Sequence, residues 1–228
     1  MTASLVRRLA AEGIGTAFLV ATVVGTGLMG ERMTGDAGLQ LLANALATAA
    51  MLGVLIAVLA SISGAHFNPA VSLVACLNRT LLWSELAPYA LAQILGGTIG
   101  AIAAHAMFAE PLLQIATQQR GSLALGISEV VAAFGLVAVI LLAGKRPALP
   151  ALVAFYIGAA YWFTASTSFA NPPVTIARMF TDSFAGIRPM DAPLFIAAQI
   201  LGAAAAWAAV AWLKHGQDQT GTHSGPAG

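Results

Sequence analysis

Long stretches without a charged side chain constrain the fold of this chain more than any other feature of its sequence. A helix needs ~20 predominantly apolar residues to cross the hydrocarbon core of a bilayer. Asp, Glu, Lys and Arg are absent from residues 13–30, 37–78, 86–109, 147–177 and 192–213, and Glu129 is the one such residue in 121–144. These stretches predict six membrane-spanning helices. Each of the stretches 37–78 and 147–177 is longer than one span needs, so each contains a remainder of apolar residues beyond its span.

The composition supports an integral membrane protein. Hydrophobic residues make up 59% of the 228 residues and charged residues only 8%, whereas a soluble domain carries roughly 25% charged residues. The net charge of +1 gives no indication of a nucleic-acid partner, and the single cysteine, Cys76, excludes an internal disulfide and a multi-thiolate metal site. Arg7 and Arg8 precede the first apolar stretch as in a signal peptide, but further apolar stretches follow, so we interpret it as a retained first span.

An Asn-Pro motif occurs once in each of the two remainders. The copies are Asn68-Pro69-Ala70 and Asn171-Pro172-Pro173. Asn is a strong N-cap, and Pro is favoured at the first helical position, where no N–H is needed. Ten helical residues rise about 15 Å, half of the ~30 Å hydrocarbon core. The motifs therefore predict two half-helices that enter the membrane from opposite sides and meet near its midplane.

Other sequence matches indicate that the chain is duplicated. The sequence Ala-Gln-Ile-Leu-Gly occurs at 92–96 and again at 198–202, and Glu12 and Glu129 occupy similar places in the two halves. Repeats with three spans each are inverted relative to one another. We therefore expect one membrane domain over 1–228, divided into repeat 1 (about 9–109), a linker (110–122), repeat 2 (about 123–213) and a polar, disordered tail (214–228).

The distribution of Lys and Arg predicts the orientation, because cytoplasmic loops are richer in these residues. On the predicted topology, one side carries Arg7, Arg8, Arg79, Lys145, Arg146 and Lys214, and the other carries Arg32, Arg120 and Arg188. We therefore expect a multi-pass protein of the cell (inner) membrane with both termini in the cytoplasm.

Two half-helices that meet at their N-termini create a particular electrostatic environment. Both positive dipole ends point at one place in the bilayer, so a cation meets a barrier there while a neutral solute can accept hydrogen bonds. The carbonyl of Asn caps its helix, and its NH2 group can donate into a pore. Non-helical backbone at this depth is tolerated only where it is buried or lines a cavity. These features predict a pore.

The residues around the first motif resemble a known family. The stretch 63–71, Ser-Gly-Ala-His-Phe-Asn-Pro-Ala-Val, is similar to the signature of the aquaporin (major intrinsic protein) family, and the resemblance covers 13–213. It implies an all-α fold of six spans and two re-entrant half-helices in an inverted 3+3 repeat. It also implies a homotetramer with one pore per subunit. The stretch 174–187 resembles a bacterial subgroup often associated with arsenic resistance.

The second motif departs from the family pattern, because Pro173 stands in the Ala position and Val174 in the position of an arginine. In the family that arginine lines a selectivity filter with three other side chains. The resemblance places the filter of this chain at four small, uncharged residues: Thr48, Ala159, Ser168 and Val174. Such a filter is expected to be wide and poor in hydrogen-bond donors.

Three further expectations concern the surroundings of this filter. Arg178 lies one turn beyond Val174, so we expect it in the outer vestibule, where Asp182 is a candidate ion-pair partner. Pro173 disfavours helical backbone at Pro172, so the second half-helix is expected to begin later after its Asn than the first does. Because Pro173 has no N–H, the Asn171 carbonyl is expected to cap the N–H of Val174 instead.

Two carboxylates and one histidine have competing interpretations. Glu12 and Glu129 could be ordinary helix-end charges, but carboxylates inside a membrane are functional or structural by default. The family resemblance implies that they hold the loops before the half-helices, which we favour. His66 could line the pore or pack beneath the loop, and the sequence does not distinguish the two.

These observations favour a passive channel over an enzyme or a coupled transporter. We expect it to conduct small neutral solutes: water, glycerol-like polyols and neutral metalloids such as arsenite. A water-selective aquaporin is the close alternative. A coupled transporter is less favoured because it normally needs ionisable residues at the midplane. No metalloprotease, hydrolase or phosphate-loop motif is found, and no cofactor or metal is expected.

Overall fold

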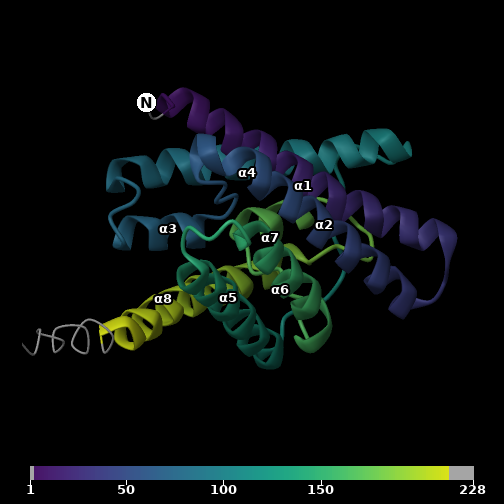
Figure 1. Cartoon of the computed structure of the whole chain (residues 1–228). Helices are drawn as coiled ribbons and strands as arrows, with labels where there is room; N and C mark the ends of the chain where they lie inside the picture. The colour runs from purple at the N-terminus through teal and green to yellow at the C-terminus, as the bar shows by residue number, and fades with distance from the viewer. Residues whose placement is uncertain (1–2, 216–228) are drawn as a thin grey trace, which may run out of the picture.

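The structure is a computed structural model that describes residues 3–215. All regular structure in this part of the chain is helical, and Figure 1 shows its arrangement. The helices are α1 (Leu5–Met33), α2 (Ala37–Ser63), α3 (Pro69–Leu77), α4 (Trp83–Phe108), α5 (Leu123–Ala143), α6 (Leu149–Phe163), α7 (Pro172–Arg178), the short 3-10 helix η1 (Pro189–Asp191) and α8 (Ala192–His215).

Five helices are long and apolar enough to cross a bilayer: α1, α2, α4, α5 and α8. The helix at the predicted fifth span, α6, has only 15 residues, which is fewer than the ~20 that a full crossing needs. It ends where Thr164 adopts extended backbone (φ −102°, ψ 135°), and the chain then runs as a loop toward α7. The predicted fold of six spans and two half-helices is therefore confirmed, with the fifth span formed by a helix shorter than the other five.

The two half-helices lie between two groups of longer helices. In Figure 1, α1, α2 and α4 form the upper part of the molecule and α5, α6 and α8 the lower part, with α3 and α7 between them. The start of α1 and the end of α8 lie on the same side, at the left of the view. Lys214 and His215, the first residues of the predicted disordered tail, belong to the last turn of α8. The rest of that prediction lies outside the described residues.

Small residues allow the long helices to pack closely within each group. A Cβ atom on Gly96 of α4 would clash with the carbonyl oxygen of Gly13 in α1, and one on Gly202 of α8 would clash with that of Val130 in α5. Helix pairs in membranes commonly approach through such residues. Gly96 and Gly202 end the two copies of Ala-Gln-Ile-Leu-Gly, so the repeated sequence makes matching contacts in the two halves.

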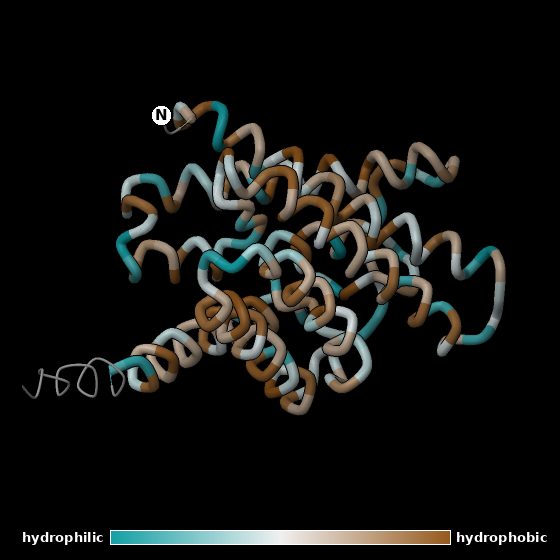
Figure 2. The backbone as a smooth tube through the Cα atoms, viewed as in Figure 1, coloured by the Kyte–Doolittle hydropathy of each residue, from teal (hydrophilic) through white to brown (hydrophobic). Residues whose placement is uncertain are grey.

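Large apolar side chains cover the outside of the helix bundle, as expected of a surface that faces lipid. Phe18, Val58, Leu95, Phe155 and Trp212 are all exposed. Figure 2 shows the long helices mostly in brown or pale shades, while much of the hydrophilic teal lies in the connections between them.

The two half-helices begin in the same way, which contradicts the expected delay at Pro173. Asn68 (φ −158°, ψ 117°) and Asn171 (φ −156°, ψ 114°) are both N-caps, and the helix starts at the next residue in each case. The first-turn N–H groups of a helix have no intrahelical partner, so Pro173 removes no backbone hydrogen bond. The expected change of cap is confirmed: Asn68 Oδ1 accepts from Ala70 N at 2.9 Å, whereas Asn171 Oδ1 accepts from Val174 N at 3.3 Å.

Candidate functional site

Two adjacent cavities run through the centre of the molecule. The first lies where α3 and α7 meet. The second extends past α3 toward Asn78 and Leu149. Both are lined by Ile56, Ala65, His66, Val71, Ile140 and Val153. The two cavities therefore share part of their walls.

The two motif asparagines face each other in the wall of the first cavity. Asn68 Nδ2 donates to the carbonyl oxygen of Ala170 at 2.7 Å, and Asn171 Nδ2 donates to that of Phe67 at 2.8 Å. Each asparagine therefore binds the residue that precedes the other one. An amide NH2 group has two N–H donors, so each asparagine retains one N–H for a solute. Both side chains line the cavity, at the place where the N-termini of α3 and α7 meet.

The loops before the two asparagines share an unusual backbone. Ala65 and Phe67 in the first loop, and Ser168 and Ala170 in the second, have φ between 47° and 52°. Non-glycine residues seldom adopt this left-handed conformation, because it crowds the Cβ atom. These residues lie three and one positions before each asparagine. The matching conformations show that the two loops follow the same path.

The two buried glutamates bind the backbone of these loops. Glu12 accepts hydrogen bonds from the N–H groups of His66 (3.0 Å) and Phe67 (2.6 Å). Glu129 accepts from those of Phe169 (3.0 Å) and Ala170 (2.8 Å). Glu12 is the eighth residue of α1 and Glu129 the seventh of α5. Neither is therefore a helix-end charge.

A glutamine from the repeated sequence completes each carboxylate site. Gln93 Nε2 donates to Glu12 at 2.8 Å, and Gln199 Nε2 donates to Glu129 at 2.6 Å. All four side chains are fully buried. A buried charge is tolerated where it is well hydrogen-bonded. The carboxylates, already occupied by these donors, have little capacity left to bind an ion.

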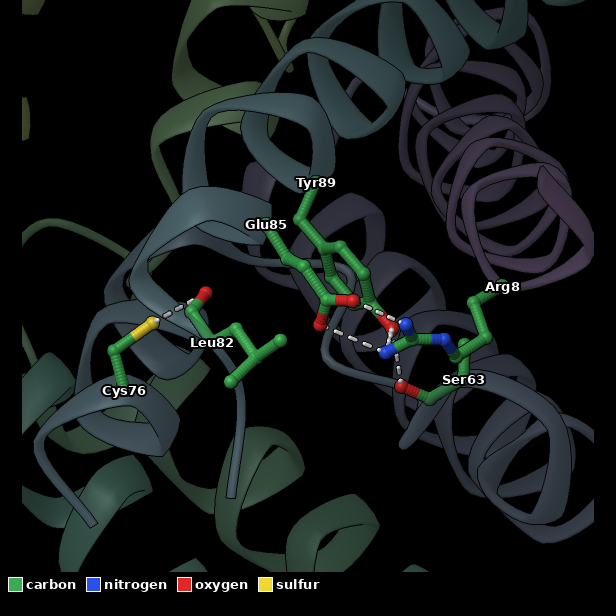
Figure 3. Close-up of polar contacts among 6 residues, drawn as sticks. All are labelled: Arg8, Ser63, Cys76, Leu82, Glu85 and Tyr89. Atoms are coloured by element: carbon green, nitrogen blue, oxygen red, sulfur yellow. Dashed lines mark hydrogen bonds and ion pairs between the residues drawn. The ribbon is translucent and has the colours of Figure 1, made fainter. Parts of the chain in front are cut away.

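A polar cluster on the α1, α2 and α4 side holds the start of the first loop (Figure 3). Arg8 forms an ion pair with Glu85, and the hydroxyl of Tyr89 donates to the carbonyl oxygen of Ser63 at 3.0 Å. Ser63 Oγ in turn donates to Glu12 at 2.6 Å. Because Ser63 is the last residue of α2, these contacts anchor the point from which the chain turns toward Asn68.

Ala159 does not take the predicted place in the filter. It is exposed and does not line the cavity. Two residues further along α6 is Tyr161, whose side chain is buried in the cavity wall and donates from its hydroxyl to Thr48 Oγ1 at 3.3 Å. Successive helical residues are about 100° apart around the axis, so a shift of two residues moves a side chain to the opposite face. The prediction was misplaced because spacing from Asn171 does not give the rotation of α6. Burial of Ile157, four residues before Tyr161, marks the cavity face.

Arg178, the last residue of α7, is buried in the wall of the first cavity. Its side chain is only 3% exposed and lines the same cavity as Thr48, Ser168 and Val174. The guanidinium carbon lies 3.4 Å from the centroid of the Phe169 ring, and Nε donates to the carbonyl oxygen of Ala185. These contacts hold Arg178 in the cavity wall. The cavity wall therefore contains the bulky Tyr161 ring and the charged Arg178 guanidinium. The sequence had predicted a wide and uncharged filter.

Asp182 does not pair with Arg178. Its carboxylate accepts from the backbone N–H of Thr117 at 2.9 Å and from the Thr117 hydroxyl at 2.8 Å. Among residues 3–215 the ion pairs are Arg8–Glu85, Arg32–Glu110 and Arg188–Asp191. The positive charge of Arg178 is therefore not neutralised by a carboxylate in this part of the chain.

Two further polar groups of the cavity wall are placed by the structure. Ser168 Oγ is buried and has no hydrogen-bond partner among the described residues. His66 lines both cavities, and its Nδ1 lies 3.0 Å from Ser72 Oγ. Its ring centroid is 5.6 Å from that of Tyr89. His66 therefore lines both cavities and also packs against Tyr89, beneath the loop before Asn68.

Comparisons with known proteins agree with this geometry. A family model described as "Major intrinsic protein" matches residues 1–163. The chain is 52% identical over 211 residues to "Aquaglyceroporin AqpS" of Rhizobium meliloti (strain 1021), a match that covers 92% of this chain and 91% of that protein. It is 37% identical over 127 residues to "Aquaporin-8" of Rattus norvegicus, which covers 52% of this chain and 48% of the relative.

A solved structure shares the fold. The X-ray structure of the aquaglyceroporin from Plasmodium falciparum matches 90% of this chain and 94% of its own, with a TM-score of 0.70 and 22% sequence identity. The match therefore extends over both halves of the chain.

Proposed function

Because the chain belongs to the major intrinsic protein family, we propose that it is a passive membrane channel for small neutral solutes, among them water and glycerol-like polyols. The observation that carries this proposal is the pair of asparagines, Asn68 and Asn171, which bind across the junction of two helix N-termini in the wall of the first cavity. The 52% identity to an aquaglyceroporin over nearly the whole chain supports the same solutes.

The junction favours a neutral solute for two physical reasons. Each half-helix presents a positive dipole end to the cavity, worth about half an elementary charge, so a cation is repelled. Each asparagine offers one N–H donor to a solute oxygen that has left bulk water. A water molecule or a polyol hydroxyl can accept this hydrogen bond without bringing a charge into the membrane.

We propose that the selectivity filter is formed by five residues: Thr48, Tyr161, Ser168, Val174 and Arg178. Arg178 and the hydroxyls of Thr48 and Ser168 present polar groups, while Val174 and the Tyr161 ring present apolar surface. A polyol has a hydroxyl-bearing edge and a hydrocarbon edge, so it can satisfy both kinds of surface. Arsenite, As(OH)3, resembles a polyol in size and hydroxyl pattern, and we propose it as a further solute on that ground.

A water-selective channel is the second candidate, and two observations favour it. Tyr161 and Arg178 both reach the cavity wall, and bulk and fixed donors at a filter suit water better than larger solutes. A coupled transporter is less supported, because Glu12 and Glu129 are engaged by backbone N–H groups and glutamines and have little capacity to bind a driving ion.

Light scattering by proteoliposomes in a stopped-flow instrument tests these functions. Purified protein is reconstituted, and the uptake of water, glycerol and arsenite is compared with that of protein-free vesicles. We expect faster uptake of water and glycerol, with glycerol flux rising linearly with its gradient. Water uptake without glycerol uptake would establish the water-selective alternative. Flux that saturates and depends on a sodium or proton gradient would indicate a transporter.

We also propose a topology and an assembly. The chain lies in the cell membrane with both termini in the cytoplasm. The start of α1 and the end of α8 lie on the same side of the molecule (Figure 1), which supports a common side for both. The two repeats span about 9–109 and 123–213, joined by the linker 110–122, and the matched contacts of Glu12 and Glu129 support this division. Four copies assemble with one pore each. Cysteine labelling of an introduced residue near either terminus tests the topology, and the mass of the detergent-solubilised complex tests the assembly.

A further inference from the structure

The linker between the two halves lies against the segment that follows α7. Gln114 N donates to the carbonyl oxygen of Phe180 at 3.3 Å, and Ala116 N to that of Met179 at 2.9 Å. Arg188 N donates to the carbonyl oxygen of Gln118 at 2.8 Å. The linker and the segment 179–188, far apart in the sequence, therefore pair over the end of α7 that carries Arg178.

Arg120, near the end of this linker, binds the backbone on both sides of Ala185. Its Nε donates to the carbonyl oxygen of Gly186 at 2.9 Å, and Nη2 donates to that of Phe184 at 3.2 Å. The carbonyl oxygen between these two, that of Ala185, accepts the hydrogen bond from Arg178 Nε. Arg120 thus binds the peptide groups on either side of the one that carries the Ala185 carbonyl, and the N–H of that peptide donates to the Ser183 carbonyl oxygen at 2.8 Å.

Both arginines also contact the ring of Phe169. The guanidinium carbon of Arg178 lies 3.4 Å from the ring centroid, and that of Arg120 lies 5.2 Å from it. Phe169 itself is held edge-on against Phe195, with ring centroids 5.0 Å apart. Through the ring and the carbonyls, Arg120 has two routes by which it can restrain Arg178.

A contribution to folding stability does not by itself explain why the buried residue 120 is a charged arginine. The residue is only 9% exposed, and no carboxylate among residues 3–215 forms an ion pair with it. Burial lowers the pKa of the Arg120 guanidinium from its ordinary value, which means that the site disfavours the charge, although arginine still stays protonated. Buried charges of this kind are costly, so a role for the guanidinium fork is the stronger explanation.

We infer that Arg120, which does not line the cavity, is a positioning residue that sets the selectivity of the channel by aiming the Arg178 guanidinium into the filter. The inference rests on the proposed function. A guanidinium can bind two carbonyls at once through its fixed fork, whereas a lysine ammonium is a point charge on a flexible stem. Without Arg120, the segment 184–186 loses two hydrogen bonds, and the Ala185 carbonyl is held less firmly by those that remain.

Four variants test the inference in proteoliposomes: Arg120→Gln, Arg178→Gln, the double variant, and Arg32→Gln as a matched control. Arg32 also contacts the linker through its ion pair with Glu110, but it is exposed and does not line the cavity. The readouts are the ratio of glycerol to water permeability and the leak of sodium ions. A defect that is only structural would lower both permeabilities by the same factor and leave their ratio unchanged.

We expect Arg120→Gln to raise the glycerol-to-water ratio about two- to tenfold, the range that follows from one weakened hydrogen bond. Arg178→Gln is expected to change the ratio in the same direction, and the double variant to add little to it. Arg32→Gln is expected to match the parent. If Arg120→Gln does not fold, Arg120→Lys takes its place, and the same rise in the ratio is expected because lysine cannot bind both carbonyls.

One result would overturn the inference: Arg178→Gln changes the glycerol-to-water ratio, but Arg120→Gln leaves it as in the parent. Where Arg120→Gln does not fold, the same comparison is made with Arg120→Lys. A double variant whose effect is the product of the two single effects would also overturn it, since the two residues would then act independently. Failure of the proposed function is distinguishable, because the unaltered protein would then conduct neither water nor glycerol.

Discussion

The substitution Asn68→Asp tests the electrostatic basis of the pore, because it changes charge and hydrogen bonding with almost no change in shape. In the parent, Asn68 Nδ2 donates to the carbonyl oxygen of Ala170 at 2.7 Å. In the variant, a carboxylate oxygen faces that carbonyl oxygen. The new carboxylate also lies at the junction of the two half-helices, where a cation otherwise meets only positive dipole ends.

The size of the effect follows from these positions. Leaving the Ala170 carbonyl without its donor costs about 1–3 kcal/mol. Each half-helix dipole end, treated as half a charge at about 4 Å with an effective dielectric of about 20, stabilises the carboxylate by roughly 2 kcal/mol. The two dipole ends offset the lost hydrogen bond, so we expect the variant to fold with the aspartate ionised. At about 4 Å the carboxylate attracts a monovalent cation by about 4 kcal/mol. A change of about 1.4 kcal/mol in a barrier corresponds to a tenfold change in rate. The rate at which cations cross the junction is therefore expected to rise by up to about a thousandfold.

Sodium flux into proteoliposomes, followed with a voltage-sensitive dye, measures this leak, and light scattering confirms that water still passes. Asn78→Asp is the matched control. Asn78 lines the second cavity but is exposed and follows the C-terminus of α3, where water screens an added charge. We expect a sodium leak in Asn68→Asp and none in Asn78→Asp. If Asn68→Asp conducts water but admits sodium no faster than the parent, the helix dipole ends do not set the cation barrier.

Three other substitutions test the filter and the loop supports. We expect Tyr161→Ala to raise glycerol permeability relative to water by about tenfold, because it removes the bulkiest group of the proposed filter; an unchanged ratio in the same uptake assay would place Tyr161 outside the filter. We expect Val174→Arg to add a second guanidinium beside Arg178 and to reduce glycerol uptake far more than water uptake, and parent-like glycerol uptake would show that residue 174 does not face the solute. We expect Glu129→Gln to destabilise the protein by about 2–5 kcal/mol, because the new amide NH2 faces N–H donors and leaves them unpaired. The unfolding temperature of this variant in detergent is compared with that of Glu110→Gln, which changes a residue of the exposed linker. Equal unfolding temperatures would contradict the role of Glu129 in supporting the loop.

The sequence determined the architecture of this protein because the signals involved are local. Charge-free stretches of membrane length predict spans, and the N-capping preference of Asn followed by Pro predicts the starts of both half-helices. The repeated Ala-Gln-Ile-Leu-Gly and the paired Glu12 and Glu129 indicate two similar halves, and the structure shows matching contacts in both. Each of these inferences uses only residues that are neighbours in the chain or copies of one another.

The tertiary structure alone decided the composition of the cavity wall. The rotation of α6 about its axis brings Tyr161 and not Ala159 to the cavity, and that rotation depends on packing against α2 and α5. Arg178 reaches the cavity because the Ala185 carbonyl and the Phe169 ring hold its long side chain there. Sequence spacing locates a residue along a helix, but helix rotation and side-chain direction depend on contacts between segments far apart in the chain. The same reason explains why a linker residue such as Arg120 could not be connected to the filter from the sequence.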